Sequence, residues 1–148
     1  CAAGIPVPRD AKDLAFTQAR QGHSNMRSIL LVSHGSKAPK AQEEIEALAA
    51  RLKKKSGIGI VQPAFLEIES PDIPEGIKQC VQKGATEVTI LLNFLNSGRH
   101  AGEDIPQIIR QARQNHPDVK FRITKPIGQQ NYLVDIFLKL LDEQTDIV

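Results

Sequence analysis

The sequence predicts an α/β fold of three layers, with a four-stranded parallel sheet between two layers of helices. Short, unbroken apolar runs such as Ile29-Leu30-Leu31-Val32 are typical of strands that are buried on both faces. They alternate with longer segments whose apolar residues recur at the i, i+3, i+4, i+7 spacing of a one-sided helix. The resulting order βαβαβαβα indicates parallel strands joined by right-handed crossovers, with helices covering both faces of the sheet.

Each expected element has a local reason. Strands are expected at 29–32, 59–66, 88–92 and 119–123, and helices at 39–55, 73–81, 105–112 and 133–141. Pro39 suits a first helical position, where its missing N–H costs nothing, and Gly84 and Pro117 end the second and third helices. The last helix carries an apolar stripe made of Leu133, Ile136, Phe137, Leu140 and Leu141.

Length and composition place the chain among globular single-domain proteins. It has 148 residues, of which 41% are hydrophobic and 24% charged, with a formal net charge of +2. This charge gives no indication of nucleic-acid binding, and no segment approaches the roughly 20 apolar residues of a membrane span. The cysteines, Cys1 and Cys80, can build neither a disulfide framework nor a cysteine zinc site. Cys80 is expected to be a buried thiol, and a reducing cytoplasmic setting fits best.

Residues 1–25 differ from the domain expected at 26–148. They contain Gly4, Pro6, Pro8 and Gly22, with no sustained apolar period. We interpret them as an N-terminal extension, either loosely packed or left over from cloning. Because the chain begins with Cys1 rather than Met, we expect upstream residues to have been removed.

Polar residues follow all four expected strands and should share one edge of the sheet. His34 follows the first strand, Glu67 the second, His100 the third and Lys125 the fourth. Ligands of open parallel sheets bind beyond this carboxyl edge, near the point where strand order reverses. In the order 2-1-3-4, His34 and His100 follow neighbouring strands and could share one metal ion or substrate. Glu67 could ligate metal or carry protons, whereas Glu69 is expected to be solvated.

Six residues beside the two histidines are candidates for binding a polyanionic ligand: Gly35, Ser36, Lys37, Ser97, Gly98 and Arg99. The glycines would let a flat ligand approach the backbone, although ordinary turns also explain them. Backbone N–H groups at helix starts near Ser36 and Gly102 could hold carboxylates or phosphates. Lys37 and Arg99 add positive charge, or are ordinary surface charges.

Three segments resemble the signatures of a known family, the class II tetrapyrrole chelatases: Ser33-His34-Gly35-Ser36, Phe65-Leu66-Glu67 with Pro71, and 94–106 (FLNSGRHAGEDIP). The resemblance is closest to the small, single-domain sirohydrochlorin chelatases of cobalamin, siroheme and nickel-cofactor synthesis. It covers about residues 27–141, and its most specific piece is Gly-x-His-x-x-x-Asp-Ile-Pro. One departure is Asn93, where relatives often have proline, and this affects the expected loop shape more than the chemistry.

The resemblance implies that the chain inserts a divalent metal into a sirohydrochlorin-type tetrapyrrole, with His34 and His100 contacting the metal and Glu67 assisting. Co²⁺ is favoured, with Fe²⁺ or Ni²⁺ as alternatives, and the metal is a substrate rather than a permanently bound cofactor. Imidazole binds these ions and can also accept the protons that leave the macrocycle. Small members resemble half of a two-lobed chelatase, which implies a homodimer.

Three other interpretations compete with this one. A carrier that binds tetrapyrrole or metal without turnover would use the same ligands. A histidine phosphatase-like enzyme would carry Arg-His-Gly after the first strand, but Ser33 stands where that arginine is needed. A purely structural α/β module would keep its biological role after His34 and His100 are both replaced by alanine.

Overall fold

The computed structural model describes residues 25–96, 98–144, 146 and 147, and only the backbone of His100 and Ala101. The expected extension at 1–25 therefore lies almost wholly outside the described residues. Four strands form one sheet: β1 (Arg27–Ser33), β2 (Ile60–Phe65), β3 (Glu87–Leu92) and β4 (Lys120–Ile123). All pairs are parallel, in the order β2-β1-β3-β4. The predicted fold class and strand order are confirmed.

The helices alternate with the strands as predicted. They are α2 (Pro39–Ser56), α3 (Ile73–Gln82), α4 (Ile105–Asn115) and α5 (Tyr132–Asp142), with a π-helical segment at His100–Asp104 and a 3₁₀ turn at Ile127–Gln129. In the part of the chain that the structure describes, no helix is long and apolar enough to cross a bilayer.

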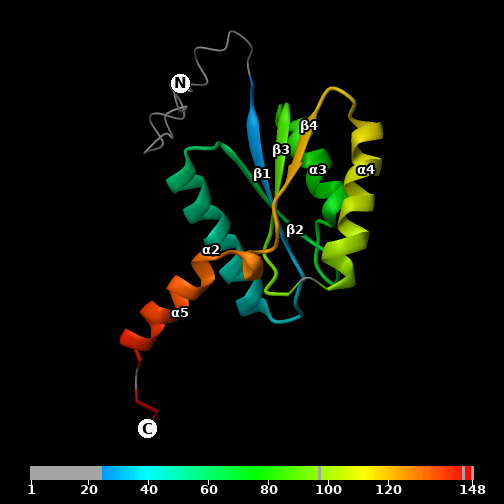
Figure 1. The fold of residues 1–148 in the computed structure, drawn as a ribbon. Helices are drawn as coiled ribbons and strands as arrows, with labels where there is room; N and C mark the ends of the chain where they lie inside the picture. Colours follow the sequence, from blue (N-terminus) through cyan, green and yellow to red (C-terminus); the bar gives the residue numbers. More distant parts are fainter. Residues whose placement is uncertain (1–24, 97, 145, 148) are drawn as a thin grey trace, which may run out of the picture.

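The main core lies between the sheet and the α3–α4 layer (Figure 1). Leu30, Val32, Val88 and Ile90 point into it from the two central strands and are fully buried. The α3 helix packs closely because a Cβ on its Gly76 would lie 2.8 Å from Leu30 Cδ1. This close packing fixes the height of α3 against the strand that leads to His34.

Local signals explain where the helices begin and end. Pro39 opens α2, and Gly57 closes it in the left-handed conformation with φ 70°. The Asp72 carboxylate caps α3 by accepting a hydrogen bond from the Glu75 amide at 2.9 Å. Gly84 follows α3 at φ 96°, in agreement with the predicted end of this helix.

Helices cover both faces of the sheet, as predicted, but the last helix lies outside both layers. The helix α5, which carries the predicted apolar stripe, extends away from the sheet beyond α2, and none of its residues is buried (Figure 1). The 3₁₀ turn before α5 is held against the loop after β3, and this contact directs the helix outward. On that face the sheet is covered by α2.

Candidate active site at the carboxyl edge of the sheet

The loops after β1 and β2 are joined side by side at the carboxyl edge. Register pairs Ser33 with Phe65 at the ends of the two strands. The ladder continues beyond them, since the Leu66 amide donates to the Ser33 carbonyl at 3.0 Å and the Glu67 amide to the His34 carbonyl at 3.1 Å. His34 and Glu67 therefore stand next to each other at the edge, as predicted, and both are exposed.

Gly35 lets these two loops approach each other. Its φ is +98°, and a Cβ built on it would lie 2.0 Å from the Glu67 carbonyl oxygen. The sequence left two explanations for this glycine open, the approach of a flat ligand and an ordinary tight turn. In the structure, the backbone of the neighbouring loop occupies the space where a side chain would be.

The side chain of Glu69 also links the loops after β1 and β2. Its carboxylate accepts a hydrogen bond from the Ser36 amide at 2.5 Å, and the residue is half-buried. The expectation that Glu69 is solvated is therefore wrong, and the Ser36 amide, proposed for a ligand carboxylate, is already used internally. The Ser36 hydroxyl accepts from the Ala38 amide at 3.1 Å and can still donate its hydrogen.

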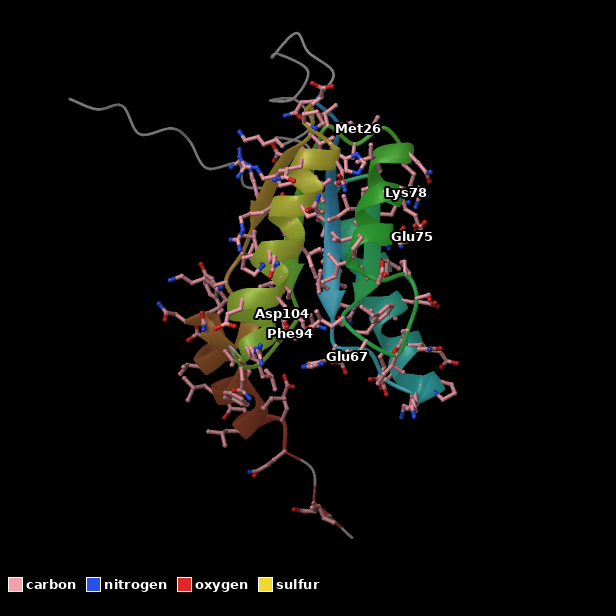
Figure 2. All side chains as sticks on the ribbon, turned by 90° about the vertical axis from the view of Figure 1, so that its right-hand side faces the viewer. Met26, Glu67, Glu75, Lys78, Phe94 and Asp104 are labelled. Carbon is pink, nitrogen blue, oxygen red and sulfur yellow. The ribbon has the colours of Figure 1, made fainter. Side chains whose placement is uncertain are left out.

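The loop after β3 supports His34 from the other side. The imidazole of His34 meets the buried ring of Phe94 edge-on, with centroids 5.4 Å apart and planes at 85°. The Asn93 amide group donates to the Ser33 hydroxyl at 3.1 Å. Asn93, noted as a departure from the family pattern, thus connects the loop after β3 with the last residue of β1. Figure 2 shows Glu67, Phe94 and Asp104 at one end of the domain and Met26 at the other.

His100 opens the π-helical segment that leads into α4. Such segments are rare and occur frequently at functional sites. The Gly102 amide donates to the Gly98 carbonyl at 3.1 Å, so this expected anion-binding N–H is also engaged within the chain. Because β1 and β3 are neighbours, the loops carrying His34 and His100 follow adjacent strands, as predicted. Ser97 lies outside the described residues.

The candidate cations are on the surface. Arg99 forms an ion pair with Glu103 (Nε to Oε2, 3.6 Å), in which both side chains are more than 70% exposed. Such a pair contributes little to stability, so Arg99 can exchange partners with an incoming carboxylate. Lys37 and Lys125 are exposed on the loops after β1 and β4.

A broad hollow of about 710 Å³ lies beside the loop after β2, and Glu67, Glu69, Asp72 and Glu75 line it. Among the described side chains, which exclude that of His100, no three histidine, cysteine or acidic groups come close enough to hold a metal. Cys80 lies on the buried face of α3, where burial raises the pKa of its thiol, so it is a buried thiol as predicted.

Comparison with known proteins agrees with this arrangement. The family model described as CbiX matches residues 28–144. The chain belongs to the CbiX family. A chloroplastic sirohydrochlorin ferrochelatase of Arabidopsis thaliana is 33% identical over 117 residues, covering 79% of the chain and 52% of the relative. A sirohydrochlorin cobaltochelatase of Methanocaldococcus jannaschii is 27% identical, covering 76% of the chain and 96% of the relative.

Solved structures of this family share the fold. The sirohydrochlorin chelatase SirB of Bacillus subtilis subspecies spizizenii, in complex with cobalt, superposes with a TM-score of 0.69 at 32% identity, covering 78% of the chain and 50% of SirB. A CbiX protein of Marinobacter aquaeolei gives 0.68 at 26% identity, covering 79% and 93%. The chain spans about half the length of the first curated relatives it matches.

Three contributors to the site were not predicted as such: Phe94, Asn93 and Glu69. Phe94 and Asn93 have a weak sequence signal, because they directly follow a buried strand that neighbours the one before His34. Nothing in the sequence indicates that the Glu69 carboxylate would meet the Ser36 amide.

Proposed function

We propose that this chain inserts a divalent metal into a sirohydrochlorin-type tetrapyrrole, with Co²⁺ favoured and Fe²⁺ or Ni²⁺ as alternatives. The observation that carries the proposal is the pairing of the His34 and Glu67 loops at the carboxyl edge of a CbiX-family chain. Relatives named as ferrochelatases and cobaltochelatases support both the substrate and the range of metals.

The reaction sets the requirements for the site. As a divalent ion enters the macrocycle, two pyrrole protons leave it, so the site must deliver the metal and receive two protons. His34 and His100 would hold the ion through neutral imidazole nitrogens, which suit first-row divalent metals. The two imidazoles would accept the pyrrole protons as the metal leaves them. Exposed Glu67, beside His34, would relay these protons to water.

The substrate is expected to bind above the same edge. Its peripheral carboxylates would meet Lys37 and Arg99, together with the Ser36 hydroxyl and the Ser97–Gly98 segment. Gly35 would contribute indirectly, by holding the His34 and Glu67 loops at contact distance. The face of the macrocycle could then approach the imidazoles without a side chain intervening.

The remaining parts of the proposal concern context. Residues 26–148 would act as a single chelatase-like domain that pairs with a second copy, in a cytoplasmic setting and without a permanently bound cofactor. Neither nucleic acid nor a membrane is expected as a partner. The alternative is a carrier that binds tetrapyrrole or metal through the same residues but does not catalyse insertion.

The test compares the wild type with His34→Ala in anaerobic metal insertion into sirohydrochlorin, followed by absorbance. Loss of a metal ligand and proton acceptor should lower the rate about 100-fold or more. His116→Ala is the matched control, since His116 caps the far end of α4 and lies away from the edge. Equal rates for His34→Ala and the control would contradict the proposed site.

A further inference from the structure

The loop after β2 contains a residue in an unfavourable backbone conformation, Ile68. Its φ is 72°, in the left-handed region, where a β-branched residue is a clear outlier. The Glu69 amide donates to the Glu67 carbonyl across it at 2.7 Å. A three-residue turn with this hydrogen bond and this φ is a γ-turn of the rare, strained kind. Ile68 therefore occupies the apex of a strained turn directly after Glu67.

Contacts on both sides hold this turn in place. The Glu67 amide donates to the His34 carbonyl at 3.1 Å, and the Glu69 carboxylate accepts a hydrogen bond from the Ser36 amide. The Glu67 carbonyl oxygen also lies 2.0 Å from where a Cβ on Gly35 would be. Because residues 67 and 69 are both fixed, the backbone between them is held in its strained conformation.

The strain does not serve the burial of Ile68. Its side chain is 62% exposed, although isoleucine is among the residues found most often in protein interiors. Glycine or asparagine would adopt the same backbone with less strain and would place no large apolar surface in water. The stability of the chain therefore gives no reason for an isoleucine at this position. Backbone outliers of this kind are concentrated at active sites and ligand clamps.

Exposed apolar side chains gather at this edge of the sheet. Apart from α5 and the two ends of the described chain, the large apolar residues that are exposed are Ile68, Leu95, Ile123 and Ile127. Ile123 ends β4, and the other three lie in loops that follow strands. Leu95 directly follows Phe94, whose ring contacts the His34 imidazole. The surface next to His34 and Glu67 thus combines polar groups with apolar ones.

We propose that Ile68 is a substrate-binding residue whose side chain the turn holds against the flat face of the bound tetrapyrrole, beside His34 and Glu67. This inference rests on the function proposed above and adds a contact for the uncharged part of the substrate. The macrocycle is a flat conjugated ring with its carboxylates on the periphery, so its faces need apolar contacts. Ile68 supplies one from a fixed backbone, and no loop has to be ordered when the substrate binds.

The size of the contribution follows from the exposed surface of this side chain. Complete burial of an isoleucine side chain strengthens binding by about 10- to 100-fold. Because 62% of Ile68 is exposed and one ring face covers only part of that surface, we expect about tenfold. Ile68 and Glu67 both line the hollow of about 710 Å³, so a ligand next to Glu67 can reach the Ile68 side chain.

The test measures binding of metal-free sirohydrochlorin to the full chain by absorbance titration, together with urea unfolding. Ile68→Asn removes the apolar surface and suits the left-handed backbone, so the dissociation constant should rise about tenfold while the urea midpoint does not fall. Ile68→Leu keeps an apolar side chain and should bind within about twofold of the wild type. Met26→Ala is the matched control, since it removes an exposed apolar side chain at the opposite end of the domain (Figure 2).

Two further measurements separate an apolar contact from other roles. The loss of affinity in Ile68→Asn should be the same at about 0.05 M and about 0.5 M salt, because salt screens charges and not apolar contacts. In insertion assays, this variant should raise KM for sirohydrochlorin and leave kcat near the wild-type value. Ile68 would contact the ring equally before and during the reaction, and such uniform binding affects KM alone.

Several outcomes would overturn the proposal. Wild-type affinity in a folded Ile68→Asn protein would show that this side chain does not meet the macrocycle. Equal losses of affinity in Ile68→Asn and Ile68→Leu, or a lower urea midpoint in the asparagine variant, would indicate that isoleucine shapes the turn instead. The titration needs no turnover: a wild type that binds sirohydrochlorin but inserts no metal contradicts the proposed function alone. Unaltered binding by Ile68→Asn in an active enzyme contradicts this contact alone, and a wild type that does not bind contradicts both.

Discussion

Gly35→Ala tests whether contact between two loops positions the active site. A Cβ at this position would lie 2.0 Å from the Glu67 carbonyl oxygen, and the φ of +98° is unfavourable for any residue with a side chain. The variant must therefore move the His34 loop, the Glu67 loop or both.

The size of the movement follows from the contact distance. Relieving the overlap to an ordinary separation of about 3.4 Å requires about 1.4 Å of displacement, and a misplacement of about 1 Å can lower a catalysed rate about 100-fold. Backbone strain adds a stability cost of about 1–3 kcal/mol. We expect insertion rates to fall about 100-fold while the protein remains folded at 25 °C.

The assay is the initial rate of anaerobic metal insertion, together with urea unfolding of the same preparations. Gly59→Ala is the control, because nothing lies within 4 Å of its added Cβ and its φ is not in the left-handed region. A folded Gly35→Ala protein with wild-type insertion rates would show that the distance between these loops does not matter, and would refute the reasoning.

Three further predictions concern the loops and the core. Glu69→Ala removes the carboxylate that accepts the hydrogen bond of the Ser36 amide and should lower the rate of metal insertion about tenfold. Glu69→Gln keeps an acceptor oxygen and should insert metal at the wild-type rate. Equal rates for the two variants would contradict a positioning role for Glu69. Gly76→Ala should lower the free energy of unfolding by about 1–2 kcal/mol, because crowding against Leu30 exceeds the gain in helix propensity. Urea unfolding that finds Gly76→Ala as stable as the wild type would contradict this packing. Burial raises the pKa of Cys80 in the folded state, so folding stability should fall as pH rises from the thiol's ordinary pKa of about 8.5 towards the folded value. Cys80→Ala should lack this loss of stability at high pH. Urea unfolding of the wild type and the variant at pH 7.5 and 9.5 measures it. The same difference in unfolding free energy between the two proteins at both pH values would contradict the prediction.

The sequence predicts the order and limits of the elements well, for a physical reason. Strands buried on both faces and one-sided helices leave different periodicities, and Gly84 and Pro39 mark helix ends by local chemistry alone. The packing of α5 does not follow from such patterns. Its stripe shows that one side of the helix is apolar, but periodicity does not specify the surface that covers it.

The site also contains features that the sequence pattern predicts and others that only the structure reveals. His34 and Glu67 could be placed at one edge because parallel strands bring their carboxyl ends together. The contacts of Gly35 and Glu69 depend on the path of the loop after β2, where Ile68 adopts a φ of 72°. This conformation is rare for a β-branched residue, and no local preference predicts it. The link between Glu69 and Ser36 therefore required the structure.

Multiple-turnover metal insertion tests the central claim most directly. Sirohydrochlorin and Co²⁺ are supplied anaerobically in large excess over the protein, and metallated product is followed by absorbance against a protein-free reaction and His100→Ala. The proposed chelatase predicts many equivalents of product per chain, with the excess over the protein-free rate lost in the variant. Tight binding of one equivalent of sirohydrochlorin, with insertion no faster than in the protein-free reaction, would contradict it and indicate a carrier.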